Sequence, residues 1–215
     1  MIYSKHVIVL ITLLPFFAGA QIKWKEIHLD NNLSFSIPSA YREVDTLGQV
    51  NFFATCSSSY IQVVKIPQPQ SAIKNEDELI QYYKDFQKIT IDQSNGSFIS
   101  DSTIRMSNLC ARVFMYQDYW NDSLQIQEHR IVLIGRFMYS FTHAYIKEKK
   151  LKAVVDRDHF FSGIKFYAVD FEDQLTVYHR NKQFDEYMTF IYRNIVPAAF
   201  LLAIIIWAFK KIRKS

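Results

Sequence analysis

The sequence predicts an α+β domain, an antiparallel sheet flanked by helices, together with an N-terminal signal peptide and one C-terminal transmembrane helix. Three features predict this: short runs in which apolar and polar residues alternate, two stretches of helical periodicity, and an apolar segment near each end of the chain. Of the 215 residues, 49% are hydrophobic and 21% are charged, and only five are Gly and five are Pro. That composition is typical of a globular protein and excludes a disordered or collagen-like chain.

Strand-like alternation dominates the chain between residues 24 and 166. A first run over residues 33–37 stops at Pro38, and a second over residues 60–66 stops at Pro67, because proline cannot donate to a strand ladder. Later runs are rich in Val, Ile, Phe and Tyr, which suit a pleated and half-buried surface. The expected hairpins are 97–106 with 109–119, turning at Ser107-Asn108, and 125–134 with 137–145, turning at Gly135-Arg136.

Two segments have helical periodicity instead. Asn75 followed three residues later by Glu78 is a capping-box pattern, which predicts that a helix begins there. The expected inward face of this helix carries Leu79, Tyr83, Phe86 and Thr90. A second helix is expected over residues 147–161, with an inward face of Leu151, Val154, Val155 and Phe161. A sheet with one helix between its early and late strands and another at its end is an α+β layer architecture.

Residues 1–20 have the pattern of a secretory signal peptide. Lys5 and His6 form the charged start, an apolar stretch covers residues 7–18, and Ala18-Gly19-Ala20 is a small-x-small cleavage site. The alternative is an uncleaved anchor. The apolar stretch would reach only about 18 Å as a helix, however, and a bilayer core is about 30 Å thick.

A membrane span is predicted over residues 195–209, which carry no charge and are followed by a basic tail over residues 210–215. The alternative is a buried C-terminal helix of a soluble domain. Aromatic and basic side chains flank the segment, and such residues sit at membrane interfaces. The expected interface anchors are Tyr192, Arg193, Trp207, Lys210 and Lys211.

These ends predict a single-pass protein of the cell membrane. The bulk of the chain, a domain over residues 21–166, would lie in the periplasm or outside the cell, and the basic tail would be cytoplasmic. Between the domain and the span, residues 167–194 form a connector that contains no Gly or Pro. We expect a helical stalk there, and the alternative is a loose linker.

The distribution of charge excludes a nucleic-acid footprint on the folded part of the chain. The formal net charge is +4, but five of the 25 basic residues lie in the two terminal segments. The remaining 20 basic residues are matched by 21 acidic residues, so the domain is close to neutral. A protein that binds nucleic acid through its fold needs a basic excess on that fold.

Several segments resemble short motifs of one protein family and follow one another in the same order as in that family. Phe35-Ser-Ile37-Pro38 followed by Tyr41 is similar to the opening strand of that family, although Trp is more usual at the position of Tyr41. The early helix with Glu78-Leu79 and the long central hairpin follow in the same order. The closing segment Phe161-Ser162-Gly163-Ile164-Lys165-Phe166 is similar to the family's last strand, from which Gly163 departs.

The family is that of the PsbP-like proteins; the resemblance covers residues 24–166 and implies a PsbP-like α+β fold. Family members are extrinsic photosystem subunits and small envelope proteins, mainly adaptors or proteins of unknown role, so the resemblance implies binding rather than catalysis. No functional motif of the family matches this chain position by position, and no site residue is carried over.

Recognisable catalytic and nucleotide-binding motifs are absent from the sequence. Counting out from the Gly135-Arg136 turn pairs His129 with Thr142, so His143 should point to the opposite face of the hairpin from His129. A hydrolytic site would have only Asp156, Asp158 and His159 as visible candidates. We interpret these three as solvated polar residues of a helix, and we predict neither a metal site nor a cofactor.

Cys56 and Cys110 are the only cysteines, and both belong to the part of the chain expected on the oxidising side of the membrane. One disulfide would close a loop of about 55 residues and stabilise the domain by about 4 kcal/mol in the chain-entropy model. The alternative is two buried free thiols, which are common in protein cores. The sequence leaves both open.

The densest aromatic segment ends in Tyr119-Trp120, just before Asn121-Asp122-Ser123. Most of the aromatic side chains in such a protein must form its core. Those near a loop are candidates for a surface that binds another protein. The candidate partner surface consists of Tyr116, Tyr119 and Trp120.

These observations predict a non-enzymatic, membrane-anchored envelope protein that acts as an adaptor or assembly partner for another membrane or periplasmic protein. The alternative is a small-molecule or lipid-binding module at the membrane surface, with an apolar pocket between the sheet and the helix that begins at Asn75. A hydrolase is the third possibility.

Overall fold

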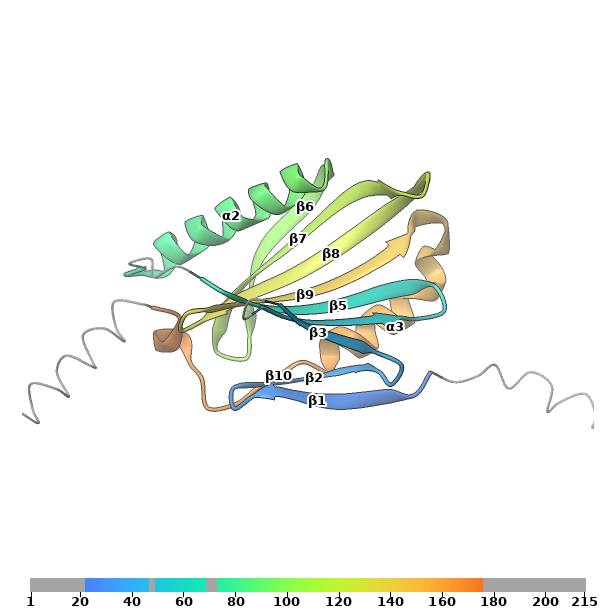
Figure 1. Ribbon diagram of the computed structural model, residues 1–215. Helices are drawn as coiled ribbons and strands as arrows, with labels where there is room; N and C mark the ends of the chain where they lie inside the picture. Colours follow the sequence, from blue (N-terminus) through green and yellow to red (C-terminus); the bar gives the residue numbers. More distant parts are fainter. Residues whose placement is uncertain (1–21, 47–48, 69–72, 176–215) are drawn as a thin grey trace, which may run out of the picture.

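The computed structural model describes residues 22–46, 49–68 and 73–175, which contain two antiparallel sheets and two long helices (Figure 1). The predicted α+β class is confirmed, but the strands form two sheets rather than one. The smaller sheet has the order β1-β2-β10. Its strands are β1 Trp24–Asp30, β2 Leu33–Pro38 and β10 Lys165–Phe166.

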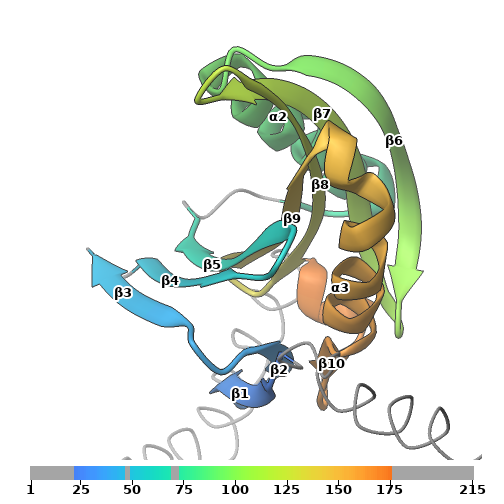
Figure 2. The same ribbon diagram turned by 90° about the vertical axis from the view of Figure 1, so that its right-hand side faces the viewer.

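The larger sheet has seven strands in the order β3-β4-β5-β9-β8-β7-β6. Both predicted turns are confirmed: Met106 pairs with Leu109, and Ile134 pairs with Phe137 across a Gly135 in the left-handed region (φ 57°). The sheet is strongly curved in the view of Figure 2. Its strands are β3 Arg42–Thr46, β4 Gln49–Thr55, β5 Ser59–Pro67, β6 Ser97–Met106, β7 Leu109–Trp120, β8 Ser123–Ile134 and β9 Phe137–Ile146.

Helix α2, Glu76–Gln93, begins where the capping pattern predicted. The Asn75 side chain accepts a hydrogen bond from the Glu78 N–H (2.9 Å), and the Glu78 carboxylate accepts from the Lys74 N–H, one residue before the expected Asn75. The predicted inward face is only partly right. Leu79 and Tyr83 are buried as predicted, whereas Phe86 and Thr90 are half-buried. The other buried residues of α2 are Gln87 and Ile91.

Helix α3, Lys150–Ser162, follows a short 3-10 turn, η2 Lys147–Lys149. Its C-cap, Gly163, packs against β2, where a Cβ would lie 2.7 Å from the Ser36 side chain, so a larger residue would force the chain to shift. Phe160 and Phe161 join the main core, which lies between the two sheets and α3. That core also contains Leu33, Phe35, Ile37, Phe52, Ile61, Val63 and Phe141.

A second apolar core lies on the opposite face of the seven-stranded sheet, under α2. Alternate residues of β7 divide between the cores: Cys110 and Phe114 face α2, while Leu109 and Ala111 face the smaller sheet. The two helices therefore cover opposite faces of one sheet. This division fixes the face on which each of the residues described below lies.

The pairing of β7 with β8 ends at Arg112 and Ile131, although both strands continue beyond these residues. The side chain of Gln174 occupies the gap. Its amide oxygen accepts from the Cys110 N–H (2.7 Å), and its amide nitrogen donates to the carbonyl oxygens of Cys110 (2.8 Å) and Leu133 (3.0 Å). Gln174 thus replaces the missing backbone pairing between the two strands.

Tyr83 of α2 completes this arrangement from the other side. Its hydroxyl accepts from the Leu133 N–H (2.8 Å) and donates to the Cys110 carbonyl oxygen (3.0 Å). We call the contacts that Gln174 and Tyr83 make with Cys110 and Leu133 the Gln174 clasp. Burial raises the pKa of Tyr83, so its hydroxyl remains a hydrogen-bond donor throughout the physiological range.

The Gln174 clasp corrects the expected boundary at residue 167. Residues 171–174 form a 3-10 turn, η3 Phe171–Gln174, and Gln174 is fully buried. The Gly135 N–H donates to the Asp173 carbonyl oxygen (2.8 Å), and Arg105 lies over the Phe171 ring. The first part of the predicted connector therefore belongs to the folded domain rather than to a stalk.

The predicted terminal features lie outside the described residues. These are the signal peptide, the remainder of the connector, the span over residues 195–209, the basic tail, and the interface anchors Tyr192, Arg193, Trp207, Lys210 and Lys211. Among the described residues, no helix combines the length and the apolar composition that crossing a bilayer requires.

Gln174→Ala is expected to lower the free energy of unfolding by about 2–4 kcal/mol, because it leaves the buried Cys110 N–H and Leu133 C=O without the partner that Gln174 supplies. Urea denaturation measures this. The matched control is Gln81→Ala on α2, whose side chain is exposed and donates to Asp85 (2.9 Å). The control should change stability by no more than about 0.5 kcal/mol. Equal effects of both substitutions would contradict a structural role for the clasp.

Candidate functional site

The β7–β8 hairpin ends in an exposed aromatic pair, Tyr119 and Trp120, with 76% and 67% of their surfaces accessible. Trp120 pairs with Ser123 across a two-residue turn in which Asn121 (φ 47°) and Asp122 (φ 62°) are both left-handed. Two left-handed residues form the turn whose twist matches that of an antiparallel hairpin. The turn therefore fixes the backbone conformation next to the aromatic pair.

Tyr116, the third residue of the predicted partner surface, is buried (3% exposed), and its inclusion in that surface was wrong. Its ring stacks with those of Phe114 and His129, with the His129 ring 4.8 Å from Phe114 and 5.3 Å from Tyr116. On a strand, residues 114 and 116 share one face, and in this hairpin that face is the one covered by α2. Exposure begins only at the tip.

The predicted register of the central hairpin is confirmed, since His129 pairs with Thr142. The His129 Nδ1 and the Thr142 hydroxyl are 3.0 Å apart. Burial lowers the pKa of His129 to about 3, so the ring is neutral at physiological pH.

His143 lies on the other face, as predicted, where it pairs across the strands with Glu128. It is fully buried against Tyr145 and Phe161, and neither ring nitrogen has a hydrogen-bond partner. Burial lowers its pKa to about 4, with a smaller contribution from the Arg157 guanidinium. His129 and His143 therefore cannot bind one metal ion.

Glu128 is a buried carboxylate that no motif of the sequence marks. Arg130 donates to Glu128 (3.0 Å) and lies 3.8 Å over the Phe161 ring. Arg157 of α3 is 3.9 Å from the other Glu128 oxygen. Alternation along β8 places Glu128 under α3, and this position could have been inferred once the hairpin register was fixed.

The three candidate hydrolytic residues are not brought together. Asp156 is buried and accepts a hydrogen bond from the Ser59 hydroxyl (3.1 Å), whereas Asp158 is exposed and paired with Arg157 (2.7 Å). The His159 ring packs against Trp24, with a centroid distance of 4.2 Å. Within the described part of the chain, no group of three or more His, Cys, Asp or Glu side chains is placed to hold a metal ion.

Cys56 and Cys110 are both free thiols and both buried. They belong to different cores, Cys56 to the core between the sheets and Cys110 to the core under α2. Burial raises the pKa of each thiol to about 11. Of the two possibilities left open by the sequence, the structure contains the buried thiols.

The space between α2 and the sheet, proposed above as an apolar pocket, is filled. Leu79, Tyr83 and Ile91 pack on Phe114 and Ile131 there. Farther along the helix, Gln87 accepts from Arg112 (3.0 Å) and donates to Asp101 (3.0 Å), and Arg112 also pairs with Asp101. A ligand could enter only by displacing these contacts.

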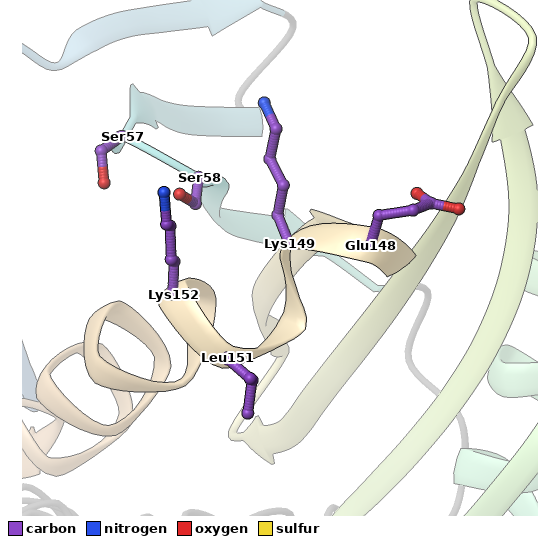
Figure 3. Close-up of a pocket in the computed structure, with 6 residues that line it drawn as sticks. All are labelled: Ser57, Ser58, Glu148, Lys149, Leu151 and Lys152. Carbon is purple, nitrogen blue, oxygen red and sulfur yellow. The ribbon is translucent and has the colours of Figure 1, made fainter.

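A depression of about 360 Å³ lies at the start of α3. Figure 3 shows Lys149 and Lys152 on the side of the Ser57-Ser58 turn, whereas Leu151 points away from that turn. The predicted inward face of α3 was wrong at two positions, because Leu151 and Val155 are 89% and 72% exposed. The buried residues are instead Ala153, Asp156, Phe160 and Phe161.

The domain is similar in structure to cyanobacterial PsbP (CyanoP) from Synechocystis sp. PCC 6803. The TM-score is 0.53 with 13% sequence identity, over 70% of this chain and 96% of that protein. The chain has a PsbP-like fold. This similarity concerns the fold, and it transfers no site residue.

Two further solved structures are similar at lower scores. LpqN, involved in cell envelope biogenesis of Mycobacterium tuberculosis, has a TM-score of 0.39 and 8% identity over 72% of this chain and 96% of its own. The Ran-binding protein Mog1p of Saccharomyces cerevisiae has a TM-score of 0.41 and 10% identity over 69% and 97%. No family model and no curated protein sequence matches the chain.

The buried histidines predict a loss of stability in mild acid. Unfolded histidine takes up a proton near pH 6.5, whereas folded His143 resists protonation down to about pH 4. The unfolded state therefore binds more protons between these values, and stability falls as the pH falls through them. His143→Leu should remove this contribution. The free energy of unfolding of the variant, relative to wild type, should therefore be about 2 kcal/mol higher at pH 5 than at pH 7.5.

Urea denaturation at the two pH values measures this gain. Met138→Leu is the control, because Met138 is a buried residue of the same strand that does not titrate. Its effect on stability should be equal at both pH values. A His143→Leu variant that keeps the wild-type pH dependence would contradict the assignment.

Proposed function

We propose that the chain is a non-enzymatic, membrane-anchored envelope protein whose exported domain binds another membrane or periplasmic protein, as an adaptor or assembly partner. The observation that carries this proposal is the exposure of Tyr119 and Trp120 at the tip of the β7–β8 hairpin. The apolar segments near the two ends of the sequence support export and anchoring.

The physical chemistry of the tip favours binding to a protein. Trp and Tyr contribute more than most residues to protein interfaces, because each buries a large area with few rotatable bonds. Successive residues on a strand point to opposite faces, so Tyr119 and Trp120 offer contacts on both faces of the hairpin. The left-handed turn has already fixed the backbone, which lowers the entropic cost of association.

The charges around the tip favour a partner with basic side chains. Asp118 and Asp122 flank the aromatic pair, and no Lys or Arg lies between residues 113 and 129. Asp118 is held in place by a hydrogen bond from Gln127 (2.7 Å). A partner surface that combines an apolar recess with basic side chains would complement this tip.

Trp120→Ala is expected to weaken binding of the partner at least about tenfold, as is usual for a central aromatic residue of an interface. The measurement is photo-crosslinking of the full-length chain in membranes, with the crosslinker at position 119, followed by mass spectrometry. Wild type should yield one dominant protein adduct, and Trp120→Ala should lose it.

The matched control is Ile89→Ala, which removes an exposed apolar side chain (55% accessible) from α2. This variant should retain the adduct. An adduct that persists unchanged in Trp120→Ala, or one that Ile89→Ala removes equally, would refute the hairpin tip as the binding site.

A further inference from the structure

Helix α3 exposes apolar residues in the middle of its solvent face. A helix advances about 100° per residue, so Leu151 and Val155 lie within about 40° of each other. The buried residues Ala153, Asp156 and Phe160 lie on the opposite side. The exposed pair therefore cannot be explained as a margin of the core.

Lysines flank Leu151, whereas the exposed Asp158, paired with Arg157, lies one turn beyond Val155 on the same side of the helix. Lys147, Lys149, Lys150 and Lys152 are all exposed, and Glu148 is the only acidic residue among them. Lys147 and Lys150 flank Leu151 on one side of the helix, and Lys152 lies on the other. We call Leu151, Val155 and these four lysines the α3 basic patch.

The start of the helix adds to the positive potential of the patch. No side chain caps α3, and its first turn contains no acidic residue, whereas α2 has an Asn cap and three acidic residues in its first turn. A helix N-terminus carries a partial positive charge that favours anions. Lys149 and Lys152 also border the depression beside Ser57 and Ser58, whose hydroxyls can donate hydrogen bonds (Figure 3).

We propose that the α3 basic patch docks on the surface of an anionic phospholipid bilayer. The lysines would contact headgroup phosphates, and Leu151 and Val155 would enter the boundary between the headgroups and the acyl chains. Exposed apolar residues with lysines on either side of the helix are the composition of segments that lie at that boundary. The hairpin tip, with its two carboxylates, has the opposite charge preference.

The geometry of the chain permits this docking beside the predicted anchor. Figure 1 shows the start of α3 at one end of the domain and η3 at the other. A strand of 12 residues, such as β7, is about 40 Å long. Residues 176–194, when extended, reach at most about 65 Å, so a domain tethered at residue 195 can lie flat on the same membrane.

The test uses the full-length chain with Val155→Cys, labelled with an environment-sensitive fluorophore and reconstituted in vesicles that contain a lipid-borne quencher. One set of vesicles is phosphatidylcholine, and the other is phosphatidylcholine mixed equally with phosphatidylglycerol. The buried thiols of Cys56 and Cys110 should not react, and the labelled wild-type chain checks this. Ile89→Cys, on the exposed side of α2, is the matched control site.

The label at position 155 should be quenched and blue-shifted in the anionic vesicles only, and high salt should reverse both changes. Lys147→Gln combined with Lys150→Gln should weaken docking about 25-fold, or about fivefold for each lysine. The label at position 89 should show neither quenching nor a blue shift in either kind of vesicle. A label at position 155 that stays in water, or that is quenched equally in both vesicles, would overturn the proposal.

Discussion

The Gln174 side chain holds β7 and β8 together where their own backbone pairing ends, and much of the fold depends on this contact. Beyond Arg112 and Ile131 the two strands no longer pair with each other, and the residues there, Cys110 and Leu133 among them, are buried. A buried group without a partner costs about 1–3 kcal/mol. Because Gln174 and Tyr83 satisfy several such groups together, β7 and β8 can stop pairing inside the protein without leaving these groups unpaired.

This arrangement gives the two ends of the domain different roles. At the end that contains η3, the chain is fastened to the sheet by Gln174 and by the Asp173 carbonyl. At the other end, the strands run on to a hairpin tip with exposed aromatic residues, next to the basic start of α3 (Figures 1 and 2). The proposed binding surfaces thus lie far from the point at which the described chain ends. A partner or a membrane could engage them without disturbing the clasp.

Sequence patterns predicted those features that depend on neighbouring residues. Strand pleating and helix capping act over a few residues. The sequence therefore predicted the alternation in β7, β8 and β9, both hairpin turns and the Asn75 cap. The aromatic pair at the tip was found for the same reason. The buried face of α3 was not predicted correctly, because its apolar residues Leu151 and Val155 are exposed while Asp156 is buried and bonded to Ser59. The pattern treats apolar residues as buried, and here that assumption fails.

The sequence by itself determined the α+β class, the central hairpin with its register, and the opposite faces of His129 and His143. These follow from local sterics and from the two-residue period of a strand. Only the tertiary structure decided that the strands form two sheets, that Tyr116 lies under α2, and that Gln174 belongs to the domain. Each of these depends on contacts between residues far apart in the chain, such as Gln174 with Cys110. Local periodicity does not encode those contacts, because they arise only when the complete sheet has formed.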